Sequence, residues 1–130
     1  MGGPEMLGNC EVIAFAATTD LDRAREFYQG TLGLSLIDQN PYACVFDVSG
    51  TMLRVTAVAE VATPDYTVLG WRVADMDGAI SGLRSKGVSF TRYEGLGQDD
   101  KGIWTTPNGD QIAWFTDPDG NTLSLTQFAR

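Results

Sequence analysis

The 130-residue chain contains no histidine, only two cysteines, and nine Lys and Arg residues against seventeen Asp and Glu residues. The lack of histidine excludes Ser-His and Cys-His activation of a nucleophile, and it removes the commonest ligand of zinc and iron. Two cysteines are too few for a disulfide framework, and Cys44, in the apolar run of residues 43–46, is expected to be a buried thiol. No segment has the pattern of a signal peptide or the length of a membrane span. These absences lead us to expect a cytoplasmic protein.

The formal net charge is −8. Nucleic acids and anionic membrane surfaces are bound through basic faces, so the charge predicts neither as a partner. An acidic surface that keeps the protein soluble is the simpler interpretation. The length and the 43% hydrophobic content predict a single domain over residues 1–130. Residues 1–9, with three Gly and one Pro, are expected to form a flexible leader.

The chain contains two internal repeats in the same order. The segment DLDRA at residues 20–24 returns as DMDGA at residues 75–79, and DVSGTMLRVT at residues 47–56 returns as DPDGNTLSLT at residues 117–126. Repetition of this kind predicts two copies of one supersecondary unit, over residues 10–59 and 66–128, with a cleft between them. Asp and Gly in the later repeat could suggest a calcium loop, but the spacing fails the EF-hand pattern and favours a turn.

Hydrophobic periodicity and turn signals predict the same order of elements in each unit. The first unit is expected to contain a strand at residues 11–18, a helix that begins at Asp20 and ends at Gly30 or Gly33, and three strands at residues 34–37, 42–48 and 52–58. The second is expected to contain a strand, a helix, a further strand, a hairpin and a last strand, at residues 66–74, 75–87, 88–93, 103–106 with 111–116, and 122–128.

Residues 94–106 have no counterpart in the first unit, because the offset between the repeats grows from fifty-five to seventy residues. An insertion in one copy is where a function-specific loop is expected. Within it, Asp99, Asp100 and Lys101 could reach a ligand, although a solvated charged loop is the simpler interpretation.

The doubled unit, the helix start DLDRAREFY at residues 20–28, Leu32-Gly33-Leu34 and the closing FTDPDGN at residues 115–121 resemble the vicinal oxygen chelate superfamily. This superfamily includes glyoxalase I, extradiol dioxygenases, fosfomycin-resistance enzymes and bleomycin-resistance binding proteins. The resemblance extends from about Val12 to Phe128. It implies an α+β fold in which two tandem βαβββ units form a curved mixed sheet around a cleft. It also implies a homodimer, and the sequence leaves open whether units pair within one chain or across a dimer.

Enzymes of the superfamily hold a metal with side chains on the first and last strands of each unit. Those positions match Ile13 and Val68, seven residues before each helix-start Asp, and Arg54 and Ser124, four residues after each turn Gly. Ile and Val cannot coordinate a metal, Arg repels a cation, and a lone Ser is a weak ligand. We therefore expect no metal and no cofactor.

Arg54 could instead offer its guanidinium to a carboxylate, phosphate or carbonyl group. Equally, it could pair internally with Asp47 or Glu11. Aromatic side chains on a curved sheet are more often core than ligand platform, but Trp104, beside the insertion, is expected at the cleft mouth. The candidate ligand-binding residues are Ile13, Phe15, Tyr42, Arg54, Val68, Trp104, Trp114 and Ser124.

The sequence thus predicts a metal-free small-molecule-binding protein of the glyoxalase/bleomycin-resistance type, with a planar or anionic ligand in the cleft between the units. The alternatives are an enzyme of the superfamily, such as a glyoxalase-like lyase or isomerase, either independent of metal or with an unrecognised metal site. No catalytic residue and no particular ligand can be named from the sequence.

Overall fold

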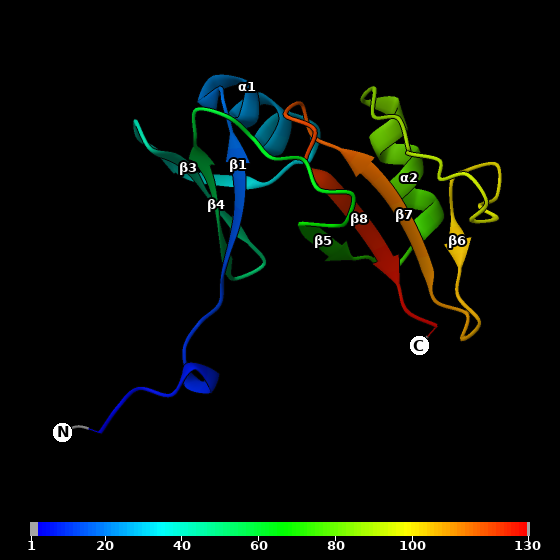
Figure 1. The fold of residues 1–130 in the computed structure, drawn as a ribbon, viewed down its shortest axis with the longest axis horizontal. Helices are drawn as coiled ribbons and strands as arrows, with labels where there is room; N and C mark the ends of the chain where they lie inside the picture. Colours follow the sequence, from blue (N-terminus) through cyan, green and yellow to red (C-terminus); the bar gives the residue numbers. More distant parts are fainter. Residues whose placement is uncertain (1–2, 130) are drawn as a thin grey trace.

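Two copies of a β-α-β-β-β unit follow one another in the computed structural model, which describes residues 3–129 (Figure 1). A short 3-10 turn, η1 (Leu7–Asn9), precedes them in the segment expected to be a flexible leader, of which residues 1 and 2 lie outside the described part. The first unit consists of β1 (Ile13–Thr18), α1 (Leu21–Arg25) continued by the π-helical segment η2 (Glu26–Thr31), β2 (Ser35–Gln39), β3 (Ala43–Val48) and β4 (Thr51–Ala57). The second consists of β5 (Leu69–Arg72), α2 (Met76–Ser85), β6 (Trp104–Thr105), β7 (Gln111–Thr116) and β8 (Thr122–Gln127). No helix of residues 3–129 combines the length and apolarity needed to cross a membrane.

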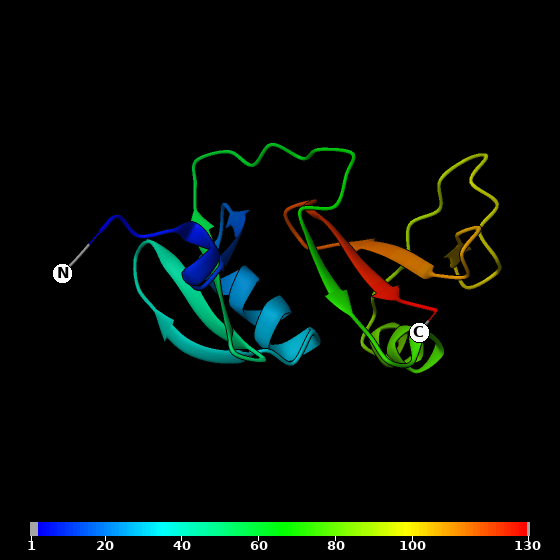
Figure 2. The same ribbon diagram turned by 90° about the horizontal axis from the view of Figure 1, so that it is seen from below.

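Each unit forms its own four-stranded mixed sheet, in the order β1-β4-β3-β2 and β5-β8-β7-β6. The first strand of each unit runs parallel to the last, and the other neighbours are antiparallel. Strands β1 and β5 are the edges at which the two sheets meet, but no ladder joins them within residues 3–129. The fold is therefore α+β with two curved, open sheets. Figure 2 shows both helices on one side of the sheets, the helix side, and the linker of residues 58–68 on the other, the linker side.

The repeated aspartates begin the two helices in the same way. The side chain of Asp20 accepts a hydrogen bond from the backbone N–H of Arg23, and that of Asp75 accepts one from Gly78. Each N-cap thus satisfies an N–H group that has no partner within the helix, and an acidic residue in the first turn favours the helix dipole. The first repeat in the sequence is therefore a duplicated helix start.

The strand expected at residues 88–93 is absent, which corrects the sequence prediction. The backbone N–H of Thr91 donates to the carbonyl of Trp114, and pairing with β7 resumes only where Trp104 lies opposite Ile112. Residues 92–103 leave the sheet between these two points, so the insertion interrupts the edge strand of the second sheet. The part of the edge strand that still pairs as a ladder with β7 is the two-residue strand β6.

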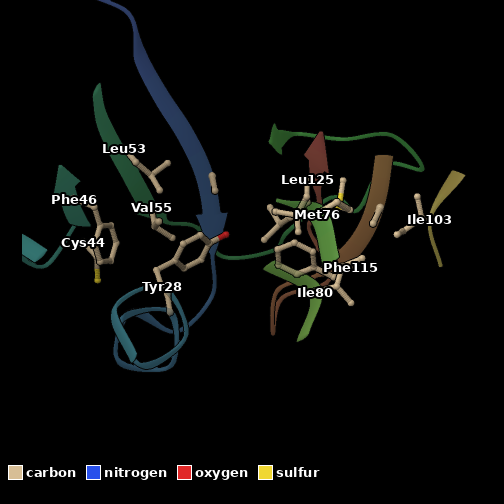
Figure 3. Packing of buried hydrophobic residues seen from close by; sticks show 14 residues of the cluster. Tyr28, Cys44, Phe46, Leu53, Val55, Met76, Ile80, Ile103, Phe115 and Leu125 are labelled. Carbon is tan, nitrogen blue, oxygen red and sulfur yellow. The ribbon is translucent and has the colours of Figure 1, made fainter. Parts of the chain in front are cut away.

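The buried core lies on the helix side of both sheets, in two groups (Figure 3). Under the first sheet, Phe46, Leu53 and Val55 pack with Tyr28, and the ring centroids of Tyr28 and Phe46 are 5.9 Å apart. The thiol of Cys44 is buried in this group, as expected. Under the second sheet, the core is formed by Met76, Ile80, Ile103, Phe115 and Leu125. The other faces of the strands lie on the linker side because side chains alternate along a strand.

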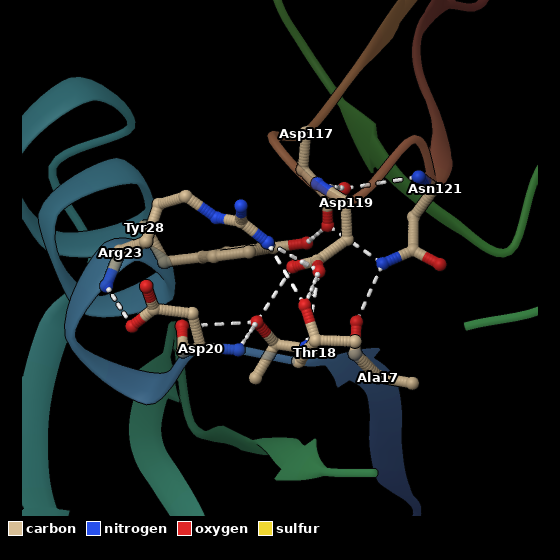
Figure 4. A network of polar contacts seen from close by, with 9 residues as sticks. Ala17, Thr18, Asp20, Arg23, Tyr28, Asp117, Asp119 and Asn121 are labelled. Atoms are coloured by element: carbon tan, nitrogen blue, oxygen red, sulfur yellow. Dashed lines mark hydrogen bonds and ion pairs between the residues drawn. The ribbon is translucent and has the colours of Figure 1, made fainter. Parts of the chain in front are cut away.

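The closing turn of residues 117–121 joins the two units (Figure 4). The hydroxyl of Tyr28 donates to Asp117 Oδ2 at 2.6 Å, and the side-chain amide of Asn121 donates to the same oxygen at 2.7 Å and to the carbonyl of Ala17 at 2.8 Å. The backbone N–H groups of Asp119 and Asn121 donate to Asp117 Oδ1. Four donors thus converge on the Asp117 carboxyl group, and we call this group the clasp.

Asp119 extends the clasp to the end of β1. It accepts hydrogen bonds from the hydroxyls of Thr18 and Thr19, and it pairs with Arg23 at 2.6 Å. Burial opposes ionisation of Asp119, but these hydrogen bonds and the Arg23 charge outweigh it and lower the pKa of the carboxyl group. The second repeated segment therefore begins with a turn, as the sequence predicts, and the Asp side chains of this turn hold the units together.

Candidate functional site

The linker-side face of the first sheet is apolar and open. Ile13, Phe15 and Met52 are between 41% and 55% exposed on it. Phe15 lies beside Arg54 in the register of β1 and β4, and Val45 lies on the other side of Arg54. A half-buried arginine therefore stands among apolar side chains on an exposed face.

The guanidinium of Arg54 has no carboxylate partner within residues 3–129. The ion pairs of this part of the chain are Arg23–Asp119 and Lys101–Asp77. Internal pairing of Arg54 with Asp47 or Glu11, one of the two sequence-based alternatives, is thus not seen in the structure. An arginine without an internal counter-ion is able to bind an anionic group.

The linker-side face of the second sheet is aromatic and hydroxylated. Trp104 stacks on Trp114 with ring centroids 6.3 Å apart, and Tyr93 meets Trp114 edge to face at 5.3 Å. Ser124 lies opposite Trp114 on one side and Gly70 on the other. A Cβ atom at Gly70 would lie only 2.9 Å from Ser124 Oγ, so the glycine leaves room for this hydroxyl.

Two adjoining cavities lie on the linker side and share Tyr66 as a wall. The first, of about 540 Å³, lies between β1 and the linker and is lined by Phe15, Thr56 and Val68 among others. The second, of about 480 Å³, lies between the linker and the insertion and is lined by Tyr93 and Trp114 among others. Both volumes fall within the range of small-molecule sites.

The structure brings together only part of the predicted set. Phe15 and Val68 share the first cavity, and Trp114 lines the second. Ile13, Arg54, Trp104 and Ser124 lie on the flanking sheet faces but do not line either cavity. Tyr42 is 75% exposed just before β3 and lines neither cavity.

Tyr66 and Thr56 are among the lining residues that the sequence-based set lacks. The aromatic side chain of Tyr66 is a sequence signal for a binding role. The position of Tyr66, however, depends on how the linker folds back over the edges of the sheets. No local pattern predicts that path.

The insertion is an ordered loop built around Gln98. The Gln98 side chain accepts a hydrogen bond from the backbone N–H of Tyr93 at 2.6 Å and donates to the carbonyls of Thr91 and Gly102 at 2.9 and 2.8 Å. Its charged residues are engaged locally, because Asp99 accepts from two backbone N–H groups of the loop and Lys101 pairs with Asp77 of α2. The loop thus fixes the position of Tyr93 beside Trp114, and burial raises the pKa of the Tyr93 phenol, which stays protonated.

Residues 12–125 match the family model of the Glyoxalase/Bleomycin resistance protein/Dioxygenase superfamily. The chain belongs to this superfamily. The fold is similar to that of a superfamily protein from Alicyclobacillus acidocaldarius, with 21% identity, a TM-score of 0.70 and coverage of 94% of this chain and 93% of that one. It is also similar to a lactoylglutathione lyase from Agrobacterium tumefaciens, with 17% identity, a TM-score of 0.67 and coverage of 89% and 92%. A fosfomycin resistance protein from Listeria monocytogenes gives 13% identity, a TM-score of 0.71 and coverage of 89% and 90%.

The positions at which superfamily enzymes hold a metal do not fit a metal in this chain. Ile13, Arg54, Val68 and Ser124 supply one hydroxyl and one fixed positive charge, which is not a ligand set for a divalent cation. Within residues 3–129, no group of three or more His, Cys, Asp or Glu side chains is arranged to hold a metal ion. The four positions matched by sequence to the superfamily's metal ligands therefore lack a donor set for a divalent cation.

Proposed function

We propose that this superfamily member is a metal-free small-molecule-binding protein. Its ligand would be a planar anion held on the linker-side faces of the sheets. Arg54 would bind the anionic group, while Phe15 and the stacked pair Trp104 and Trp114 would contact the planar body. Ser124 supplies a hydroxyl for a polar substituent.

The observation that carries this proposal is the position of Arg54. Its charge has no carboxylate partner in the described chain and stands beside an exposed phenylalanine. An arginine that binds a ligand must have its guanidinium free to donate hydrogen bonds to an anion. The neighbouring apolar face supplies the burial that an aromatic ligand needs.

We also propose that the site is completed in a homodimer. Arg54 and Ser124 lie outside the two linker-side cavities of a single chain, and within residues 3–129 no ladder joins the edge strands β1 and β5 where the sheets meet. A second copy laid over these edges would cover the exposed Ile13 and Phe15 and would enclose Arg54. The apolar face is of the kind that mediates association.

The experiment is calorimetric titration of naphthalene-2-carboxylate into chelator-treated protein, with the neutral 2-naphthamide as a comparison. We expect saturable binding of the carboxylate, binding at least tenfold weaker for the amide, and a loss of this preference in Arg54→Met. Arg25→Met, which removes a charge from the exposed surface of α1, is the matched control and should bind as the wild type does.

Equal binding of carboxylate and amide, or full binding by Arg54→Met, would contradict the role of Arg54. Conversion of the probe to a product would contradict a pure binding function and would favour the enzymatic alternative.

A further inference from the structure

A third cavity, of about 420 Å³, lies on the helix side of the molecule, opposite the proposed ligand site. Figure 2 shows α2 and the end of η2 as neighbours on this side. The floor is formed by Trp71, Phe115 and Leu125, and the Trp71 and Phe115 rings stack with centroids 6.5 Å apart. One wall is residues 31–34 after the first helix, and the other is the face of α2 that carries Gly78, Gly82 and Lys86.

Gly82 lowers the stability of helix α2. A glycine inside a helix is less favourable than alanine by about 1 kcal/mol. A Cβ atom at Gly82 would meet nothing within 4 Å, so no protein contact requires a glycine there. Its effect is to leave open space on the wall of the cavity.

The charged residues that line this cavity are Lys86 and Arg72, and no Asp or Glu is among them, although acidic residues outnumber basic ones by seventeen to nine in the chain. Lys86 Nζ donates to the carbonyl of Gly30 at 3.0 Å across the rim. Arg72 shares its strand face with Gly70 rather than with Trp71, and its guanidinium lies over the Phe128 ring at 5.1 Å, so Lys86 supplies the positive charge at the rim. Neither forms an ion pair with a carboxylate of residues 3–129.

We infer that this cavity is a second binding site, for a monocarboxylate with an apolar body. The apolar body would lie on Trp71 and Phe115 in the space that Gly82 leaves open, and the carboxylate would meet Lys86 at the rim. The site is independent of the one proposed on the linker side, because the sheets separate the two.

The test uses decanoate as the probe and fluorine NMR of protein labelled with 5-fluorotryptophan. The three tryptophan signals are assigned by single Trp→Phe variants. Decanoate is expected to shift the Trp71 signal in a saturable way and to leave Trp104 and Trp114 unmoved, and decanol is expected to bind at least fivefold more weakly. Naphthalene-2-carboxylate at the linker-side site should shift Trp104 and Trp114, so the two proposals fail or succeed separately.

Four variants, in α2 and at the Lys86 that follows it, sharpen the test. Gly82→Leu should abolish the Trp71 shift, while Ser81→Leu, on the exposed neighbouring position, should leave it unchanged. Gly82→Ala should raise the melting temperature without ligand, because alanine favours the helix, and yet weaken decanoate binding several-fold. Lys86→Met should remove the preference for decanoate over decanol.

Three results would overturn the inference. They are a Trp71 signal that does not respond to millimolar decanoate, a shift of equal size in Gly82→Leu, and decanol binding as tightly as decanoate. A response of Trp104 and Trp114 alone would also overturn it.

Discussion

The hydrogen bond from Tyr28 to Asp117 links the first unit to the second, and Tyr28→Phe removes it without removing the ring. Both residues are buried, with 1% and 5% of their surface exposed. The lost bond is short, at 2.6 Å, and it leaves Asp117 Oδ2 with only the Asn121 amide as a donor. Hydrogen bonds to charged groups contribute about 1.5–3 kcal/mol, so we expect the free energy of unfolding to fall by about 2 kcal/mol.

The assay is urea denaturation at pH 7 and a fixed protein concentration, followed by tryptophan fluorescence. With an m-value of about 2 kcal/mol/M, the midpoint should fall by about 1 M with no change in m. Tyr42→Phe, which removes a hydroxyl from an exposed tyrosine, is the matched control and should leave the midpoint unchanged. A shift in Tyr28→Phe below about 0.25 M would refute the clasp as a stabilising contact.

The Tyr28–Asp117 pair also predicts how the stability of the protein changes at alkaline pH. Burial, followed by the charge and hydrogen bond of Asp117, raises the pKa of Tyr28 above the ordinary value of 10.0. The folded chain therefore keeps a proton that the unfolded chain loses, and wild-type stability should fall as the pH rises above 10. Tyr28→Phe lacks this group, so its deficit relative to the wild type should shrink over the same range.

Three further predictions concern Asp119, the insertion and the exposed sheet face. The pKa of Asp119 is lowered in the folded state from its ordinary value of 3.8. Its contribution to the free energy of unfolding is therefore complete above pH 3.8 and is lost as the pH falls below that value. The urea midpoints of the wild type and Asp119→Asn should therefore converge in acid, and a gap that stays constant down to pH 2 would contradict this. Gln98→Ala removes three hydrogen bonds from the insertion, so limited proteolysis should cut within residues 92–103 at least tenfold faster, whereas unchanged cutting would show that the loop is held by other contacts. Light scattering should give twice the chain mass for the wild type and a single chain mass for Phe15→Asp, and a monomeric wild type would rule out the proposed homodimer.

Much of the fold could be predicted because its signals are local. Asp20 and Asp75 begin helices through bonds to the third residue beyond them, and the turn glycines Gly50 and Gly120 adopt positive φ angles of 91° and 88°. Helix caps and turns depend on residues that are close in the sequence. Because of the internal repeat, the sequence contains each of these signals twice. The helix of the first unit was predicted as one element, and its second half adopts wider π turns, which end where Leu32 N–H donates to the Phe27 carbonyl.

The failures arise from contacts between distant segments. Residues 88–93 have strand-like composition, but the insertion takes the chain away from β7 after Thr91, and only the structure shows that Trp104 resumes the edge. The path of the linker, which places Tyr66 between two cavities, also has no local signal, and Tyr42, exposed outside both cavities, stays a prediction. The absence of metal donors needed only residue identities, but whether Arg54 pairs with an acid depends on side-chain geometry across strands.

The central claim is that a positive charge on the linker-side sheet face, and no metal ion, binds the ligand. The most direct measurement is the affinity of chelator-treated protein for naphthalene-2-carboxylate, compared between the wild type and Arg54→Met. The account predicts saturable binding by the wild type without added metal and at least tenfold weaker binding by Arg54→Met. Binding that appears only when a divalent metal is added, or that is equal in the two proteins, would contradict it.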